Sequence, residues 1–261
     1  MHYAIQIAYD GRPYSGWQRQ ERSRGIQEEV ERALGELSSC EITVVAAGRT
    51  DKGVHARGQV ISCELPRIWE PQRLRLALDA RLPSSIRTIR VAPVPSNFDA
   101  RYDAQWREYI YFLWFARYTY PHLSGYSWSL YRPWKDEAVR QGCAYLEGTH
   151  DCTSFCRASD LPENPLRTLY RVSYHRKGDW GWLRVRGNAF LTNMVRIIVG
   201  SLHEVGLERR DPLWIRDLLE ERQNREAAGR TAPPEGLFLW KVGYEKDLWN
   251  ACVPESGKET T

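Results

Sequence analysis

Hydrophobic and polar residues follow two successive rounds of the same pattern along the chain. Residues 3–9 alternate with the two-residue period of a half-buried strand, and residues 26–37 place apolar side chains at helical spacing, with Ser23 available as a cap. The remaining elements predicted for the first round are strands at 42–46 and 59–65, a helix at 71–80 and a strand at 86–94. The predicted order is β-α-β-β-α-β.

The second round begins after the Pro93-Val94-Pro95 break. Its predicted elements are an aromatic strand at 106–115, a helix at 135–146, a hairpin of strands 168–175 and 182–186, helices at 190–205 and 212–221, and a strand at 237–244. This is a second β-α-β-β-α-β order with an added helix. Residues 227–234 are predicted to form a loop.

Two such rounds predict an α+β protein made of two ferredoxin-like halves. Residues 1–97 form the first half, residues 98–250 the second, and residues 251–261 a polar tail. We expect the two sheets to join into one extended antiparallel sheet with helices on one face and a basic cleft between the halves. A site in that cleft would take residues from both halves.

Composition narrows the class of protein without deciding it. A chain of 261 residues with 42% hydrophobic residues can form one or two ordinary cores. The sequence shows no membrane-spanning stretch and no signal-peptide pattern, so the expected location is the cytoplasm. Six cysteines form no CxxC pair and no metal spacing with histidine. We therefore expect reduced thiols and no bound metal.

The basic residues are mostly arginine. Of 37 basic residues six are lysine and 31 are arginine, and the chain also has 11 Trp and 14 Tyr. Arginine binds phosphate through two parallel hydrogen bonds and stacks on bases, which favours a nucleic-acid partner. A genome that encodes Arg in preference to Lys explains the composition equally well, because a net charge of +4 is modest.

The most informative segment is residues 47–60, Ala-Gly-Arg-Thr-Asp-Lys-Gly-Val-His-Ala-Arg-Gly-Gln-Val. Its Thr-Asp-Lys-Gly run has the residue types of a tight turn, which predicts Asp51 on a loop between strands. In an extended chain Arg49 and Asp51 point to the same face, so a guanidinium would lie beside a carboxylate suited to act as a nucleophile or base. A lone Asp in a turn is more often only a turn former. His55, a turn histidine without an evident partner, is expected to be structural.

Residues 48–55 resemble the catalytic motif of the bacterial tRNA pseudouridine synthase A (TruA) family. Further segments resemble that family in the same order over roughly the first 245 residues. They are Tyr9-Asp10-Gly11, Tyr14-Ser15-Gly16-Trp17-Gln18-Arg19-Gln20, Gly25-Ile26-Gln27, Phe98-Asp99-Ala100-Arg101-Tyr102, Arg107-Glu108-Tyr109-Ile110-Tyr111, Asn188-Ala189-Phe190, Met194-Val195-Arg196, Ile198-Val199-Gly200-Ser201-Leu202 and Glu235-Gly236-Leu237.

The resemblance implies an isomerase that converts uridine to pseudouridine at positions 38, 39 and 40 of the tRNA anticodon arm, without a cofactor. It also implies a homodimer in which one tRNA contacts both subunits. Asp51 would be the catalytic carboxylate, acting as nucleophile or as a base at C2′, and the sequence leaves both routes open.

The same resemblance implies roles for three residues of the second half. Arg196 would pair with Asp51 and orient it, whereas without the resemblance it is a snorkelling surface arginine. Tyr109 would stack on the flipped uracil and help to remove the C5 proton, whereas the plainer interpretation is a sheet-face aromatic. Leu237 would exclude water by apolar packing, which ordinary core packing equally explains.

Four arginines are predicted to contact RNA. The resemblance implies that Arg49 enters the helical stack and keeps the target base out, and Arg101, Arg107 and Arg117 could follow the phosphate backbone or be merely solvated. Two departures from the family pattern stand out, Glu108 in place of a basic residue and Leu191-Thr192-Asn193 in place of a histidine-rich step. Neither is expected to touch the chemistry, although each could affect RNA binding.

Two other functions remain open. The first is an RNA-binding protein of this fold without catalysis, which would bind tRNA equally well after Asp51→Ala. The second is an Asp-dependent glycosyl hydrolase, but such enzymes usually need a second carboxylate as acid, and the motif around Asp51 offers none.

Overall fold

The computed structural model describes residues 1–19, 23–220 and 224–249. The tail predicted at 251–261, the last residue of the helix predicted at 212–221, and Cys252 lie outside these residues. The five described cysteines form no disulfide with one another. No helix within the described ranges is long and apolar enough to cross a membrane.

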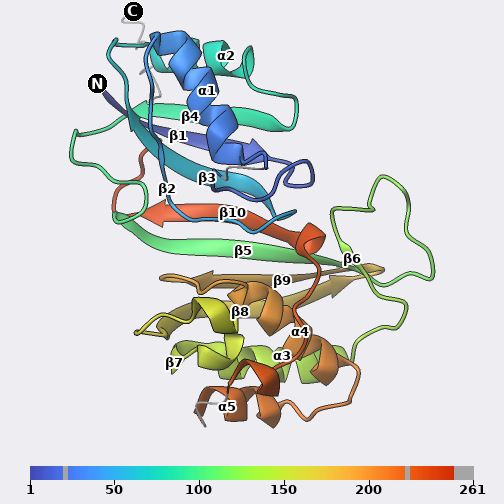
Figure 1. The fold of residues 1–261 in the computed structure, drawn as a ribbon. Helices are drawn as coiled ribbons and strands as arrows, with labels where there is room; N and C mark the ends of the chain where they lie inside the picture. The colour runs from blue at the N-terminus through green and yellow to red at the C-terminus, as the bar shows by residue number, and fades with distance from the viewer. Residues whose placement is uncertain (20–22, 221–223, 250–261) are drawn as a thin grey trace, which may run out of the picture.

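A single large sheet runs the length of the molecule (Figure 1). Its strands are β1 (His2–Tyr9), β2 (Val45–Ala46), β3 (His55–Glu64), β4 (Ile86–Pro93), β5 (Ala104–Trp114), β6 (Trp128–Ser129), β7 (Gly148–Asp151), β8 (Leu166–Lys177), β9 (Trp180–Gly187) and β10 (Leu237–Tyr244). They lie in the order β4-β1-β3-β10-β5-β9-β8-β7, with β2 paired to β3 and β6 paired to β5. The sequence pattern missed the short strands β6 and β7.

The described helices are α1 (Ile26–Ser38), α2 (Pro71–Asp79), α3 (Asp136–Leu146), α4 (Met194–Gly206) and α5 (Leu213–Glu220). The predicted cap of α1 is wrong, because Gly25 rather than Ser23 lies at the N-cap and no side chain caps the helix. The first N–H groups of α1 instead donate to the backbone oxygens of Gly16 and Trp17. Tertiary contacts thus satisfy the helix end that sequence reasoning assigned to a side chain.

The α+β class and the one extended sheet are confirmed, but the sheet is not wholly antiparallel. β10, the last strand of the described residues, lies between β5 and β3, and it pairs parallel to β3 at Phe238↔His55 and Leu239↔Ala56. β5 and β6 are also parallel. The division into two ferredoxin-like halves stays a prediction.

One face of the sheet is buried, and the other is only partly covered. A row of paired residues crosses the sheet from β1 to β8, and all are buried: Tyr9, Ala56, Leu239, Tyr109, Val185 and Val172. On the opposite face Phe112, Phe238 and Trp240 are only half-buried, and the Phe112 ring lies 5.3 Å from Phe238 and 6.0 Å from Trp240 between centroids. We call this second surface the open face.

His203 of α4 is a buried histidine held in its neutral form. Its ring lies 4.7 Å from Trp128 between centroids, and its Nδ1 accepts a hydrogen bond of 3.0 Å from Trp134 Nε1. Burial, and then the positive charge of Arg230, lower the pKa of His203 to about 4. Because the unfolded chain has a histidine pKa near about 6.5, the unfolded state binds this proton more readily.

Protonation of His203 should therefore destabilise the fold as the pH falls. The stabilisation is complete above the unfolded pKa and is lost as the pH falls toward about 4, which amounts to roughly 2 kcal/mol of unfolding free energy between about pH 7.5 and 5. His203→Asn keeps an acceptor for Trp134 without titrating, so we expect a flatter pH dependence. Urea unfolding across this range measures it, with the exposed His122→Asn as control. Equal slopes for wild type and His203→Asn would contradict the assignment.

Candidate functional site

The loop of residues 47–54 presents Asp51 between β2 and β3, on a loop between strands as the turn pattern predicts. Val54 N–H donates to Asp51 O at 3.1 Å, and Gly53 has φ +78, which a non-glycine residue rarely adopts. Thr50 fixes the loop from the other side. Its hydroxyl lies 2.8 Å from the Tyr9 hydroxyl, and its backbone oxygen accepts from Trp17 N–H at 2.9 Å.

His55 braces the same loop from the open face. It is the first residue of β3 and fully buried, so the expectation of a turn residue without a partner is wrong. Its Nδ1 accepts from Gly11 N–H at 3.1 Å, and its Nε2 therefore carries the proton and lies 2.9 Å from Gly125 O. Burial lowers the pKa of His55, which fits this neutral, structural role.

Close backbone packing explains why glycine stands at position 11, in the Tyr9-Asp10-Gly11 motif. A Cβ on Gly11 would lie 2.0 Å from Val54 O, so only glycine lets the first loop approach the Asp51 loop. The two sequence motifs are therefore one structural unit.

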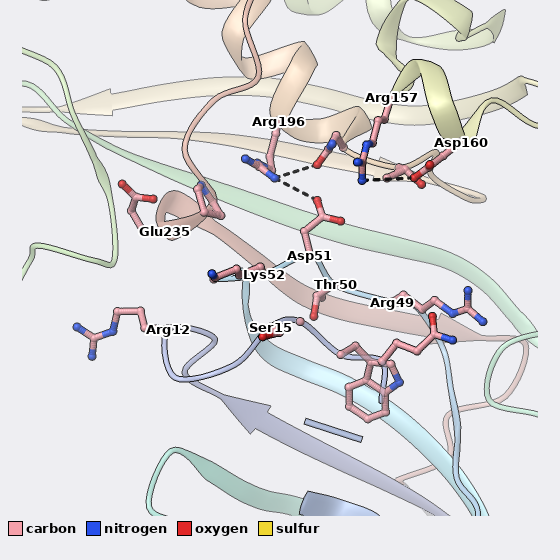
Figure 2. A pocket seen from close by; sticks show the side chains of 17 residues that line it. Arg12, Ser15, Arg49, Thr50, Asp51, Lys52, Arg157, Asp160, Arg196 and Glu235 are labelled. Atoms are coloured by element: carbon pink, nitrogen blue, oxygen red, sulfur yellow. Dashed lines mark hydrogen bonds and ion pairs between the residues drawn. The ribbon is translucent and has the colours of Figure 1, made fainter. Parts of the chain in front are cut away.

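Asp51 forms an ion pair with Arg196 of α4. Arg196 Nη1 lies 3.3 Å from Asp51 Oδ2, and the side chains are 16% and 34% exposed respectively. Figure 2 shows Arg196 directed at Asp51, whereas Arg49 is directed away from it. The guanidinium beside the carboxylate is thus that of Arg196, and the extended-chain expectation that placed Arg49 there is wrong because the turn at Asp51 separates the two side chains.

Two cavities meet at Asp51. The first has a volume of about 800 Å³ and takes charged residues from distant parts of the chain, among them Arg12, Lys52, Arg157, Asp160, Arg196 and Glu235 (Figure 2). The second has a volume of about 630 Å³ and includes Tyr109, Phe190 and Arg101. Both cavities are lined by Trp17, Arg49, Asp51, Thr192 and Asn193. Asp51 therefore faces a cationic space on one side and a partly aromatic one on the other.

Tyr109 brings a neutral phenol to the second cavity. The side chain is buried, and its ring meets Phe190 edge to face at 5.0 Å between centroids. Burial, and then the negative charge of Asp51, raise the pKa of the Tyr109 hydroxyl. The hydroxyl thus keeps its proton at neutral pH and can donate or relay a hydrogen bond.

Arg107 is engaged by the protein itself. Its guanidinium donates to four backbone oxygens, those of Ala47, Ala104 and Asn188 at 2.9–3.0 Å and that of Arg101. Burial lowers the pKa of Arg107. These bonds tie β5 to the start of the Asp51 loop, so the geometry favours a structural role over the predicted phosphate contact.

Of the other residues predicted to belong to the site, only some line a cavity. Arg101 is exposed and lines the second cavity. Arg117 is exposed but lines neither cavity, and Leu237 is buried at the start of β10, also outside both linings. Glu108 is buried against Arg186, with 2.7 Å between Arg186 Nη2 and Glu108 Oε2, so this departure from the family pattern is an internal ion pair.

Sequence reasoning missed several residues of the site. Lys52 lies directly after Asp51, and Arg157 lies in a segment without a recognised motif. Both residues line the first cavity. Asn193 was expected to be remote from the chemistry, yet its Oδ1 accepts from Arg196 Nη1 at 2.8 Å. Its position three residues before Arg196, at the start of an apolar helix, is the signal that could have found it.

The arrangement combines an oriented carboxylate, a neutral phenol and several cations around an open space. It can stabilise positive charge on a sugar carbon, or attack that carbon, while cations hold an anionic chain. Asp160 and Glu235 also line the first cavity, so a second carboxylate is present outside the motif. The described residues contain no group of three or more His, Cys, Asp or Glu side chains arranged to hold a metal ion.

Comparison with known proteins gives a consistent result. The family model described as tRNA pseudouridine synthase matches residues 5–103 and 143–245. The tRNA pseudouridine synthase A of Cereibacter sphaeroides is 41% identical over 250 residues, covering 94% of this chain and 98% of that protein. The proteins of the same name from Brevibacillus brevis and Bacillus subtilis are 42% and 38% identical, covering 91% and 94% of this chain and 97% and 100% of those proteins.

The structural role of Arg107 can be tested through stability. Lysine cannot reproduce the planar fork that reaches four carbonyls, so Arg107→Lys should lower the free energy of unfolding by about 2–4 kcal/mol. The exposed Arg101→Lys should change it by less than about 0.5 kcal/mol. Urea denaturation of both variants measures this. Unchanged stability in Arg107→Lys would return Arg107 to the candidate RNA contacts.

Proposed function

The chain belongs to the tRNA pseudouridine synthase family, and we propose that it converts uridine to pseudouridine at positions 38, 39 and 40 of the tRNA anticodon arm. Family membership makes it an isomerase. The observation that carries the proposal is the Asp51 carboxylate, held by Arg196 at the meeting point of a cationic cavity and an aromatic one. Its cellular location is proposed to be the cytoplasm, where tRNA would be its substrate.

Asp51 acts on the ribose in this proposal. The reaction breaks the N1–C1′ bond, turns the uracil, joins C5 to C1′ and releases the C5 proton, so no oxidant or reductant is needed. Asp51 either bonds to C1′ as the N1–C1′ bond breaks, or takes a proton from C2′. Both routes need an ionised carboxylate. The adjacent guanidinium of Arg196 favours that form through a charge-assisted contact.

Uracil would occupy the second cavity, against Tyr109 and Phe190. The Tyr109 ring offers a face for stacking, and its protonated hydroxyl can relay the C5 proton by accepting one hydrogen bond while donating another. Leu237 would contribute from the core rather than from the cavity wall. Buried beside Tyr111 in the sheet, it keeps water from entering beneath the site.

The cations around Asp51 would hold the RNA. Arg49 is exposed and directed away from Asp51 (Figure 2), and in this proposal it would insert into the place of the flipped base. Lys52 and Arg157, which line the first cavity, and Arg101, which lines the second, would contact phosphates on either side of the target nucleotide. Arg117 would contact RNA farther from the target.

The open face supports a homodimer. Aromatic rings extend across it, with the buried Trp114 and the half-buried Trp180 5.0 Å apart between centroids beside the Phe112 cluster. An aromatic surface of this kind is characteristic of protein interfaces. Light scattering should therefore give a solution mass twice that of one chain, and a monomer at micromolar concentration would contradict the proposal.

The first test of the reaction uses tRNA tritiated at uridine C5. Wild type should release tritium and Asp51→Asn should release it at least about a thousandfold more slowly, because the amide can neither attack C1′ nor take a C2′ proton. Filter retention should show tRNA binding within about threefold for both proteins. Substrates with a single uridine at position 38, 39 or 40 test the position, and one with uridine only elsewhere in the arm is the control.

Each alternative predicts a different result in that experiment. Binding without tritium release by wild type would indicate an RNA-binding protein of this fold. Release of free uracil would indicate a glycosyl hydrolase, with Asp160 or Glu235 as the second carboxylate. Release from uridines outside positions 38, 39 and 40 would retain the isomerase but reject the proposed positions.

The cavity cations can be tested by the salt dependence of tRNA binding. Each phosphate contact releases condensed counterions, so Lys52→Ala and Arg157→Ala should each reduce the slope of log binding constant against log salt by about one unit. Arg140→Ala on the exposed side of α3 should leave the slope unchanged. Wild-type slopes in both cavity variants would exclude these two residues from phosphate binding.

A further inference from the structure

Asn193 occupies a helix start without capping the helix. It is the N-cap residue of α4 with φ 63 and ψ 4, in the left-handed region, and its side chain makes no capping hydrogen bond. Asparagine is favoured at N-caps because its side-chain oxygen accepts from the first backbone N–H groups of the helix. It also tolerates left-handed backbone better than most residues. Here the unusual backbone directs the side chain elsewhere.

The side chain of Asn193 instead forms a hydrogen bond with Arg196. Asn193 Oδ1 accepts from Arg196 Nη1 at 2.8 Å, and the same Nη1 lies 3.3 Å from Asp51 Oδ2. On its other edge, Arg196 Nε donates to Ala232 O at 2.8 Å. The two shorter bonds go to neutral acceptors, so they fix the plane of the guanidinium, and the longer contact is the one that meets the carboxylate.

We propose that Asn193 is a positioning residue that sets the Arg196 guanidinium against Asp51 and acts through Arg196 rather than on the substrate. This role rests on the proposed function, because it concerns the same reaction. The amide is suited to it, since a neutral acceptor orients the guanidinium without competing with Asp51 for its charge. A carboxylate at position 193 would compete for that charge.

The variant Asn193→Gly tests the effect of the side chain apart from the effect of the backbone conformation. Glycine adopts the left-handed conformation freely, so the variant removes the acceptor without straining the start of α4. Glu208→Gly is the matched control, because Glu208 has φ 57 just beyond the other end of α4 and is exposed. Both variants should keep a cooperative thermal transition close to that of wild type.

The expected effect is a loss of kcat without a loss of binding. A hydrogen bond to a charged group, lost where the catalytic carboxylate is oriented, should reduce kcat about tenfold to a hundredfold in Asn193→Gly. KM and the tRNA dissociation constant should stay within about twofold, and Glu208→Gly should match wild type. Asn193→Asp should be at least as slow as Asn193→Gly, because its carboxylate draws Arg196 from Asp51.

A double-variant cycle tests whether Asn193 acts through Arg196. If it does, Asn193→Gly combined with Arg196→Lys is no slower than Arg196→Lys alone. Wild-type kcat in Asn193→Gly, or losses that multiply in the double variant, would overturn the inference. A wild-type protein that forms no pseudouridine in tRNA would instead reject the proposed function, and this role of Asn193 with it.

Discussion

The ion pair between Asp51 and Arg196 joins residues 145 positions apart, and each partner depends on a different part of the fold. Asp51 is fixed through Thr50, which bonds to Tyr9 at the end of β1 and to Trp17 in the loop that follows. Arg196 is fixed at the start of α4, where the segment that leads into β10 lies against it. Ala232 bonds to Arg196 twice, accepting from the side chain and donating from its own N–H to Arg196 O at 3.0 Å. The ion pair therefore forms only when the parts of the fold that hold Asp51 and Arg196 are assembled together.

Most helices and strands of this fold can be predicted from the sequence because hydrophobic periodicity is a local property. β10 has the predicted bounds, and α2 and α3 differ from prediction by one residue at one end. The position of β10 between β3 and β5 is not local, and no pattern within residues 237–244 specifies its neighbours. The predicted cap at Ser23 was wrong for the same reason. The carbonyls that accept from the first turn of α1 belong to Gly16 and Trp17, which lie across a loop.

The site shows the same division between local chemistry and distant geometry. Asp51 could be located from its turn and from the family resemblance, and the pair with Arg196 could be expected from the resemblance. The side chain that holds Arg196 could not, because an asparagine before a helix predicts a cap, and only the left-handed backbone of Asn193 shows otherwise. Arg107 was predicted to bind phosphate because its charge is visible in the sequence, while the backbone oxygens that engage it are not.

The parallel pairing of β3 with β10 has a consequence for the order of events in folding. Joining residue 55 to residue 238 closes a very long loop, and its entropic cost is repaid only when the neighbouring pairs of β10 with β5 form as well. Because β10 is inserted in the middle of the sheet, a chain that has not yet placed it should lack the Ala232 segment that holds Arg196 toward Asp51. The contact between Asp51 and Arg196 should thus form in one late step, and species that accumulate before it should lack that contact altogether.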